Sequence, residues 1–318
     1  MGNALVDILM KLRSDDLLLQ LGLPKGSMQL IDEVMMHQIQ ESTLLLDQHV
    51  ATGGSASNTI SGLARLGIEV GLIGKIGNDS IGNFFKVDSF ENGVLTYLLG
   101  SQLSSGRCHV LISPDGERTM CTYLGAASDL NANDLTSNMF TNFDILHIEG
   151  YLVENQKLML RTAELAKAAN MEIALDLASY NVVAANRDFL RSYTEQFVDI
   201  IFANEEEAFA FTGKHDLEAA AEIASMCKIA AVKVGKRGSF IQKGTEAHTI
   251  GAAKVNCIDS TGAGDLYAAG FLYGYARGLS LDKCAKIGTV CAGHVIQFIG
   301  AKMDDRTWNS INAIAANF

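Results

Sequence analysis

The sequence lacks paired cysteines, an excess of basic residues and any apolar run long enough to cross a bilayer. Its six cysteines are scattered without a Cys-x-x-Cys pair, and no histidine cluster accompanies them, so no zinc or redox motif is present. Lysine and arginine number 25 against 36 aspartates and glutamates, which gives a net charge of −11. Because nucleic acids and anionic membranes bind basic surfaces, we expect neither as a partner, and we expect the thiols to be reduced.

Signals for export and for several hydrolase chemistries are also missing. A secretory signal begins with a basic segment and an apolar stretch, whereas Met1-Gly2-Asn3 leads directly to the acidic Asp7. The chain has no Gly-x-Ser-x-Gly elbow, and none of its seven histidines stands in a catalytic pattern. No internal repeat, low-complexity tract or linker divides the chain. We expect a cytoplasmic protein with one domain over residues 1–318.

The order of apolar segments predicts an α/β fold. From about residue 142 onward, short apolar runs alternate with stretches of helical periodicity. The predicted strands cover residues 145–148, 173–177, 200–203 and 230–234. Alternating strands and helices at this spacing imply a parallel sheet that is covered by helices on both faces.

The first half of the chain predicts a smaller β structure. Residues 32–46 are expected to form a helix capped by Asp32, and residues 70–76 a buried strand. Residues 106–123 alternate like a hairpin around a turn at 113–116. We expect a β lid built from parts of about 9–31 and 104–124.

The most informative segment is Asp259-Ser260-Thr261-Gly262-Ala263-Gly264-Asp265. It lies between a strand-like stretch, 252–258, and an apolar helical pattern, 266–276. A Gly-Ala-Gly turn that opens a helix presents bare N–H groups to an anion. Asp265 would repel a bound phosphate, but it suits a base that takes a proton from a hydroxyl during phosphoryl transfer. The alternative is a glycine turn with a capping acid, which is common in α/β proteins.

This segment and its continuation to Phe271 resemble the C-terminal signature of the PfkB/ribokinase family of carbohydrate and nucleoside kinases. The opening Gly-Asn-x-x-x-Asp at residues 2–7 is similar to the start of the family, and to its adenosine-kinase branch in particular. In the family a strand precedes this glycine, whereas only Met1 precedes it here, so either that strand is missing or the start of the sequence is misplaced. We expect this departure to affect stability more than chemistry. The resemblance covers residues 2 to about 308. It implies a ribokinase-like fold with a mostly parallel sheet flanked by helices and a small β-sheet lid.

The resemblance also implies residues that hold the acceptor. Gly53-Gly54 followed by Asn58 resembles the sugar-binding Gly-Gly-x-x-x-Asn of the family, although a helix cap is the alternative. Asp7 would accept hydrogen bonds from two vicinal hydroxyls. Arg118 on the hairpin would reach a phosphate, unless it is a solvated arginine. The predicted acceptor-binding set is Asn3, Asp7, Gly53, Gly54, Asn58 and Arg118.

Two further segments resemble nucleotide-binding motifs of the family. Asn204 to Glu207 follows a strand and resembles its Asn-x-x-Glu motif, with Glu207 holding Mg²⁺ through water. An acidic first helical turn is the alternative. Lys233, Gly235 and Gly238 lie in a segment that resembles the ATP loop and is not a Walker A sequence. A β-turn with basic residues explains the segment from Lys233 to Gly238 about as well.

The resemblance implies phosphoryl transfer from MgATP to a hydroxymethyl group of a sugar. Asp265 would be the base, and the N–H groups of Gly262, Ala263 and Gly264 would stabilise the transferring charge. Asp259 and Thr261 lie where the family often binds a monovalent cation such as K⁺ through carbonyl oxygens, with more ligands near residues 295–300.

Other functions remain open at this point. The opening motif favours a nucleoside kinase, as does the segment Asp176-Leu177-Ala178-Ser179-Tyr180, in which Tyr180 would stack on a base. A non-catalytic sugar or nucleotide sensor on the same fold would not need Asp265. An exposed apolar face of the lid would favour a homodimer through the lid.

Overall fold

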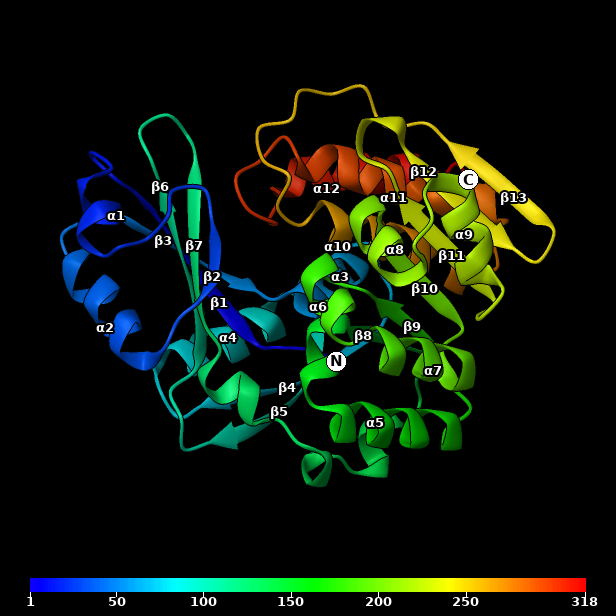
Figure 1. Cartoon of the computed structure of the whole chain (residues 1–318), viewed down its shortest axis with the longest axis horizontal. Helices are drawn as coiled ribbons and strands as arrows, with labels where there is room; N and C mark the ends of the chain where they lie inside the picture. Colours follow the sequence, from blue (N-terminus) through cyan, green and yellow to red (C-terminus); the bar gives the residue numbers. More distant parts are fainter.

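The alternating apolar runs in the second half of the chain form a six-stranded sheet in the order β13-β12-β11-β10-β9-β8. The computed structural model describes residues 1–318 and places this sheet beside a separate five-stranded lid (Figure 1). The strands are β8 (Ile145–Glu149), β9 (Glu172–Asp176), β10 (Ile200–Asn204), β11 (Ile229–Lys233), β12 (Ser239–Lys243) and β13 (Glu246–Ile250). Strands β8 to β11 are parallel, and β12 and β13 add an antiparallel hairpin at one edge. The mostly parallel sheet predicted from the sequence is therefore confirmed.

Helices cover both faces of this sheet, because successive residues of each central strand point to opposite sides. Ile201 and Ala203 belong to one hydrophobic core, and Ile200 and Phe202 belong to the other. The first core is closed by α5 (Gln156–Ala168), α6 (Tyr180–Ala185), α7 (Arg187–Phe197), α8 (Glu205–Thr212) and α9 (Asp216–Ala224). The second core is closed by α3 (Ser55–Arg65), α10 (Ala263–Ala276), α11 (Leu281–Val295) and α12 (Asp305–Ala315).

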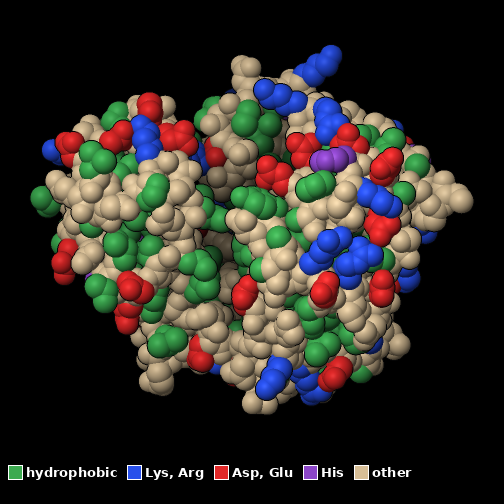
Figure 2. Space-filling view, in the orientation of Figure 1, with side chains coloured by type: hydrophobic (Ala, Val, Ile, Leu, Met, Phe, Trp, Pro, Cys, Tyr) green, Lys and Arg blue, Asp and Glu red, His purple; other side chains and the backbone are tan.

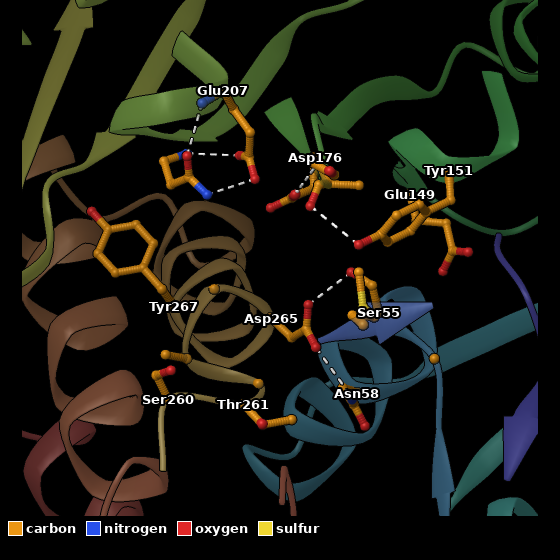
Figure 3. Close-up of a pocket in the computed structure, with 18 of the residues that line it drawn as sticks. Ser55, Asn58, Glu149, Tyr151, Asp176, Glu207, Ser260, Thr261, Asp265 and Tyr267 are labelled. Carbon is orange, nitrogen blue, oxygen red and sulfur yellow. Dashed lines mark hydrogen bonds between the residues drawn. The ribbon is translucent and has the colours of Figure 1, made fainter. Parts of the chain in front are cut away.

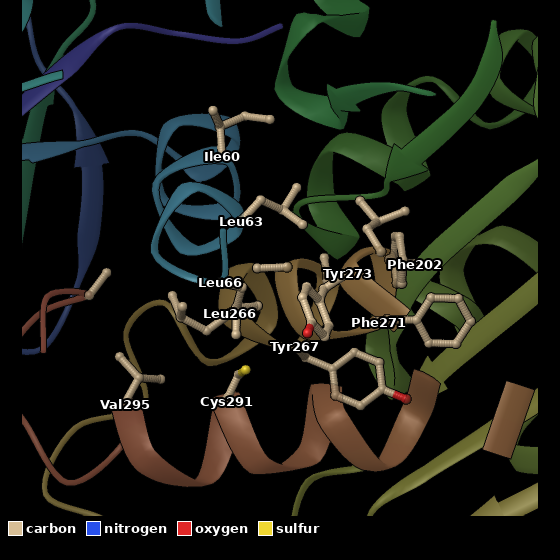
Figure 4. Close-up of a cluster of buried hydrophobic side chains, with 14 of the residues drawn as sticks. Ile60, Leu63, Leu66, Phe202, Leu266, Tyr267, Phe271, Tyr273, Cys291 and Val295 are labelled. Carbon is tan, nitrogen blue, oxygen red and sulfur yellow. The ribbon is translucent and has the colours of Figure 1, made fainter. Parts of the chain in front are cut away.

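Helix α10 is the centre of the second core, between α3, α11 and strand β10 (Figure 4). Gly270 of α10 faces Gly288 of α11 so closely that a Cβ on Gly270 would lie 2.8 Å from the Gly288 Cα. The two glycines let the helices approach, and a larger residue would force them apart. This packing fixes the position of the first turn of α10, which carries Asp265.

The lid is a sheet in the order β2-β7-β6-β1-β3. Its strands are β1 (Leu5–Lys11), β2 (Met28–Leu30), β3 (Gln48–Gly53), β6 (Gly106–Ile112) and β7 (Arg118–Tyr123). The predicted hairpin is present as β6 and β7, and β3 is a lid strand that the sequence had not indicated. Helices α1 (Asp16–Gln20) and α2 (Glu33–Ser42) lie on the side of the lid away from the larger sheet (Figure 1). Their buried Leu18 and Ile39 belong to one core with Ile8 and Leu111 of the lid strands, so the two helices cover this face of the lid sheet.

Two parallel strands, β4 (Val70–Gly77) and β5 (Val94–Ser101), form a small separate sheet with α4 (Ser80–Glu91) packed beside it. The first two residues of the chain lie between β4 and β8. The amino group of Met1 donates to the carbonyl of His147 at 2.6 Å, and Gly2 N donates to the carbonyl of Ile73 at 3.3 Å. These bonds bring Asn3 to the end of β8, beside Glu149.

Short 3₁₀ helices complete the fold at residues Gly125–Asp129, Ala132–Asp134, Ser137–Phe140, Gly150–Glu154 and Gly235–Arg237. Two predictions about local structure were wrong. Residues 252–258 do not form a strand, because no neighbouring strand pairs with them and Ile258 is 65% exposed. The helix predicted over residues 32–46 ends at Ser42, although Asp32 caps it as expected. None of the helices has the length and apolarity needed to cross a membrane.

Candidate active site

A cavity of about 1380 Å³ opens between the lid and the larger sheet, where the space-filling view shows a deep hollow (Figure 2). Its walls come from the lid strands, the ends of β8 to β11 and the first turn of α10. Pockets for a single small molecule usually measure roughly 300–1,000 Å³. The cavity is therefore large enough for two ligands side by side, with Asp265 on its wall.

Each of the four parallel strands ends in a polar residue that lines this cavity. These last residues are Glu149 of β8, Asp176 of β9, Asn204 of β10 and Lys233 of β11. The carboxyl ends of parallel strands meet at one edge of a sheet, which is where α/β proteins bind their ligands. The fold thus assembles two carboxylates, an amide and an ammonium group at one place.

The first turn of α10 has the geometry of an anion site. Gly262 adopts the left-handed conformation at φ 74°, which glycine tolerates, and it begins the helix. The N–H of Ala263 donates to the carbonyl of Ser260 at 3.2 Å. The N–H groups of Gly262 and Gly264 have no acceptor within the protein, and both residues line the cavity. Free N–H groups and the positive end of the helix dipole together favour a phosphate at this position.

Asp265 lies in the same turn, and two side chains from α3 hold its carboxylate (Figure 3). Ser55 Oγ donates to Oδ1 at 2.7 Å, and Asn58 Nδ2 donates to Oδ2 at 2.9 Å. Burial raises the pKa of Asp265 to about 7, although these two bonds oppose the change. A carboxylate with a pKa near neutrality is suited to accept a proton at physiological pH.

Lys233 brings a positive charge next to the anion site. Its Nζ lies 3.0 Å from Asp176 Oδ2, and a Cβ on Gly264 would lie 3.1 Å from the same nitrogen. Burial lowers the pKa of Lys233, but Asp176 and Glu207 outweigh it, so the pKa is raised above the ordinary value. The ammonium group therefore stays charged and can contact a phosphate that binds at Gly264.

The predicted acceptor residues lie together on the lid side of Asp265. Asn3 donates from its N and Nδ2 to Glu149 Oε1, at 2.9 and 2.6 Å. A Cβ on Gly53 would lie 2.4 Å from Asp7 Oδ1, and a Cβ on Gly54 would lie 2.2 Å from the carbonyl of Asn3. Only glycine fits at these two positions, so the pair brings β3 against the strand that carries Asp7. Burial raises the pKa of Asp7 to about 6, with Lys302 opposing the change.

The Asn204 and Glu207 pair caps helix α8. Asn204 Oδ1 accepts from Glu207 N at 2.8 Å, while Glu207 accepts from Asn204 N and Nδ2 at 2.8 and 2.7 Å. This reciprocal cap explains the motif structurally. Glu207 nevertheless lines the cavity, and burial followed by the charge of Asp176 raises its pKa to about 7, with Lys233 opposing. Gly235 and Gly238 line the cavity on the same side.

Two residues lie elsewhere than the sequence suggested. Arg118 does not line the cavity; it forms an ion pair with Asp259 and donates to Thr261 Oγ1 at 3.3 Å. Tyr180, expected to stack on a base, is 49% exposed and lies outside the cavity lining. Tyr151 lines the cavity instead, and its hydroxyl donates to the carbonyl of Ala178 (Figure 3).

Ser55, Glu149 and Asp176 are site residues that the sequence reasoning did not assign. Glu149 directly follows the predicted strand 145–148, and Asp176 lies near the end of the predicted strand 173–177, so a polar residue at the end of an apolar run was the signal available for both. Ser55 occupies a variable position of the Gly-Gly-x-x-x-Asn segment, so the motif itself does not single it out. Its contact with Asp265 joins residues 210 positions apart, which no local pattern indicates.

Comparisons with known proteins show which family shares this sequence and fold. A solved adenosine kinase from Sinorhizobium meliloti is 34% identical, with a TM-score of 0.88 over 99% of this chain and 98% of that one. A probable sugar kinase from Rhizobium etli is 33% identical, with a TM-score of 0.88 over 98% and 96%. An uncharacterized sugar kinase from Archaeoglobus fulgidus is 27% identical over 76% of this chain and 96% of its own. The sequence model of the pfkB family carbohydrate kinases matches residues 27–308, so the chain belongs to this family of phosphotransferases with alcohol acceptors.

Proposed function

We propose that this protein transfers the γ-phosphate of MgATP to a hydroxymethyl group of a sugar, with Asp265 as the general base. The observation that carries the proposal is the position of Asp265, one residue after the free N–H of Gly264 and held by Ser55 and Asn58. A base and an anion site in one helical turn can act on the two reacting groups of a single phosphoryl transfer.

In this mechanism Asp265 accepts the proton of the acceptor hydroxyl while that oxygen attacks the γ-phosphorus. The N–H groups of Gly262 and Gly264 and the ammonium of Lys233 stabilise the charge on the transferring group. Ser55 and Asn58 orient the carboxylate, and the lid keeps water away from the phosphoryl group.

The carboxylates at the edge of the sheet fit a magnesium ion that arrives with ATP. Mg²⁺ prefers oxygen ligands and keeps several waters, and Glu207 and Asp176 offer carboxylate oxygens on the wall of the cavity. Because both oxygens of Glu207 already accept bonds from Asn204, contact through water suits it better than direct ligation. When bound, the ion neutralises charge on the phosphates.

A nucleoside is the second candidate acceptor, and the apolar part of the cavity lining is the observation that supports it. The cavity carries many apolar side chains, which a polyhydroxylated sugar alone would not need. They include Leu5, Met28, Leu124, Leu130, Leu152 and Val182. A nucleoside would place its ribose hydroxyls at Asp7 and its base against these residues. The adenosine kinase from Sinorhizobium meliloti is consistent with this candidate, and the probable sugar kinase from Rhizobium etli with the first.

The test is ADP release from MgATP with ribose, fructose, ketodeoxysugars, adenosine, inosine and cytidine as acceptors. Turnover on a free sugar supports the first candidate, and turnover on a nucleoside alone supports the second. ATP binding without turnover on any acceptor would contradict the kinase proposal and favour a non-catalytic sensor. A cytoplasmic location and a homodimer remain predictions, to be checked by fractionation and by sedimentation.

A further inference from the structure

The carboxylate of Asp259 fastens three segments together next to the anion site. Its Oδ1 accepts from the N and Oγ1 of Thr261, at 3.0 and 2.8 Å. Its Oδ2 accepts from the N of Gly300 at 2.6 Å and pairs with the guanidinium of Arg118. Arg118 is the first residue of β7, so a lid strand is bound to the loop that leads directly into Gly262.

The sequence predicts a monovalent cation at this loop, held by carbonyl oxygens, and the contacts of Asp259 and Thr261 place the guanidinium of Arg118 beside that position. Both oxygens of Asp259 already accept hydrogen bonds, and Arg118 also donates to Thr261 Oγ1. Burial would raise the pKa of Asp259, but the bonds from Arg118, Thr261 and Gly300 lower it overall. The carboxylate is therefore ionised and its charge is balanced by the guanidinium. A monovalent cation at the carbonyl oxygens of the same loop would be repelled by this adjacent guanidinium.

We propose that the guanidinium of Arg118 takes the place of a monovalent cation at this loop, so that turnover does not depend on K⁺. The inference rests on the proposed phosphoryl transfer at Asp265. Arg118 acts as a positioning residue, because it holds Asp259 and Thr261 and through them the turn at Gly262.

The proposal predicts a particular response to salt. The activity of the wild-type protein is the same in potassium chloride and in tetramethylammonium chloride of equal ionic strength. Arg118→Met leaves the Asp259 carboxylate without a balancing charge, and turnover in tetramethylammonium falls by about 10–100-fold. Potassium restores part of that loss in Arg118→Met, because K⁺ can occupy the space beside Asp259. Arg118→Lys retains a positive charge, so its turnover in tetramethylammonium falls less than that of Arg118→Met.

Lys25→Met is the matched control. Lys25 also lies in the lid and pairs with two carboxylates, Asp15 and Asp115, each at 2.7 Å. Lys25 makes no contact with Asp259 and does not line the cavity. Its removal should leave turnover and the response to potassium as in the wild-type protein.

Thermal unfolding without substrates provides a readout that does not depend on the reaction. The melting temperature of the wild-type protein should be equal in the two salts, whereas potassium should raise that of Arg118→Met. A wild-type protein that potassium activates or stabilises would overturn the proposal. So would an Arg118→Met variant that is fully active without potassium, or one whose loss potassium never restores. If no protein turns over any acceptor, the proposed function fails, and the melting temperatures still decide whether Arg118 replaces the cation.

Discussion

Replacing Ser55 with alanine should change the pH dependence of turnover, because it removes one of two bonds that hold the Asp265 carboxylate. Ser55 Oγ donates to Oδ1 at 2.7 Å, while Asn58 still donates to Oδ2 at 2.9 Å. A hydrogen bond to a charged group contributes about 1.5–3 kcal/mol, and one pKa unit corresponds to about 1.4 kcal/mol. The bond favours the ionised form, so its loss raises the pKa of Asp265 further, by roughly one to two units.

The assay is kcat measured from mildly acidic to alkaline pH for the wild-type protein and Ser55→Ala. Turnover requires ionised Asp265, so each profile falls on the acidic side, and that of the variant falls at higher pH. Well above both pKa values the two proteins should differ little. Ser61→Ala is the control, because Ser61 lies on the same helix but faces a second cavity of about 250 Å³. Identical acidic limbs for the wild-type protein and Ser55→Ala would refute the assignment of Asp265 as the group that titrates.

Three further predictions concern α10 and its surroundings. Gly264→Ala places a Cβ 3.1 Å from Lys233 Nζ and next to the anion site. We expect kcat to fall by about tenfold or more, with little change in melting temperature. Normal turnover would contradict the proposal that a phosphate binds at this turn. Gly270→Ala brings a Cβ within 2.8 Å of the Gly288 backbone and should lower the free energy of unfolding by about 1–3 kcal/mol in urea titrations; an unchanged midpoint would show that the helices can separate without cost. Asp265→Asn should raise the melting temperature, because burial raises the pKa of Asp265 to about 7 in the folded protein. The unfolded chain releases this proton at lower pH, so the cost to folding grows as the pH rises toward 7 and is fully present above it. The increase should therefore be larger in alkaline than in mildly acidic buffer, and an equal increase at both would contradict the raised pKa.

Much of the active site could be predicted from the sequence, because its chemistry is concentrated in short segments. The turn at Gly262, the proposed base Asp265 and the glycines before Asn58 lie within continuous motifs, where the residue type itself limits the conformation. Strands β8 to β11 could also be predicted, because strands that are buried on both faces are continuous apolar runs in the sequence. These features depend on neighbours in the sequence.

Other features depend on contacts between distant segments and could not be derived in that way. Residues 252–258 have the composition of a strand, but no partner strand is beside them. The ion pair of Arg118 with Asp259 joins the lid to the loop before α10, and a hairpin arginine alone does not reveal its partner. Glu207 appeared as a metal ligand or a helix cap, and only the structure shows that it forms the reciprocal cap with Asn204.

The measurement that tests the central claim most directly is the turnover of Asp265→Asn beside that of the wild-type protein, with MgATP and whichever acceptor supports ADP release. Asparagine keeps the size of the side chain and can still accept a bond from Asn58, so ATP affinity and folding should be preserved. If Asp265 is the base, kcat falls by about 10²–10⁴-fold while the dissociation constant for ATP is unchanged. Turnover equal to that of the wild-type protein would contradict the account.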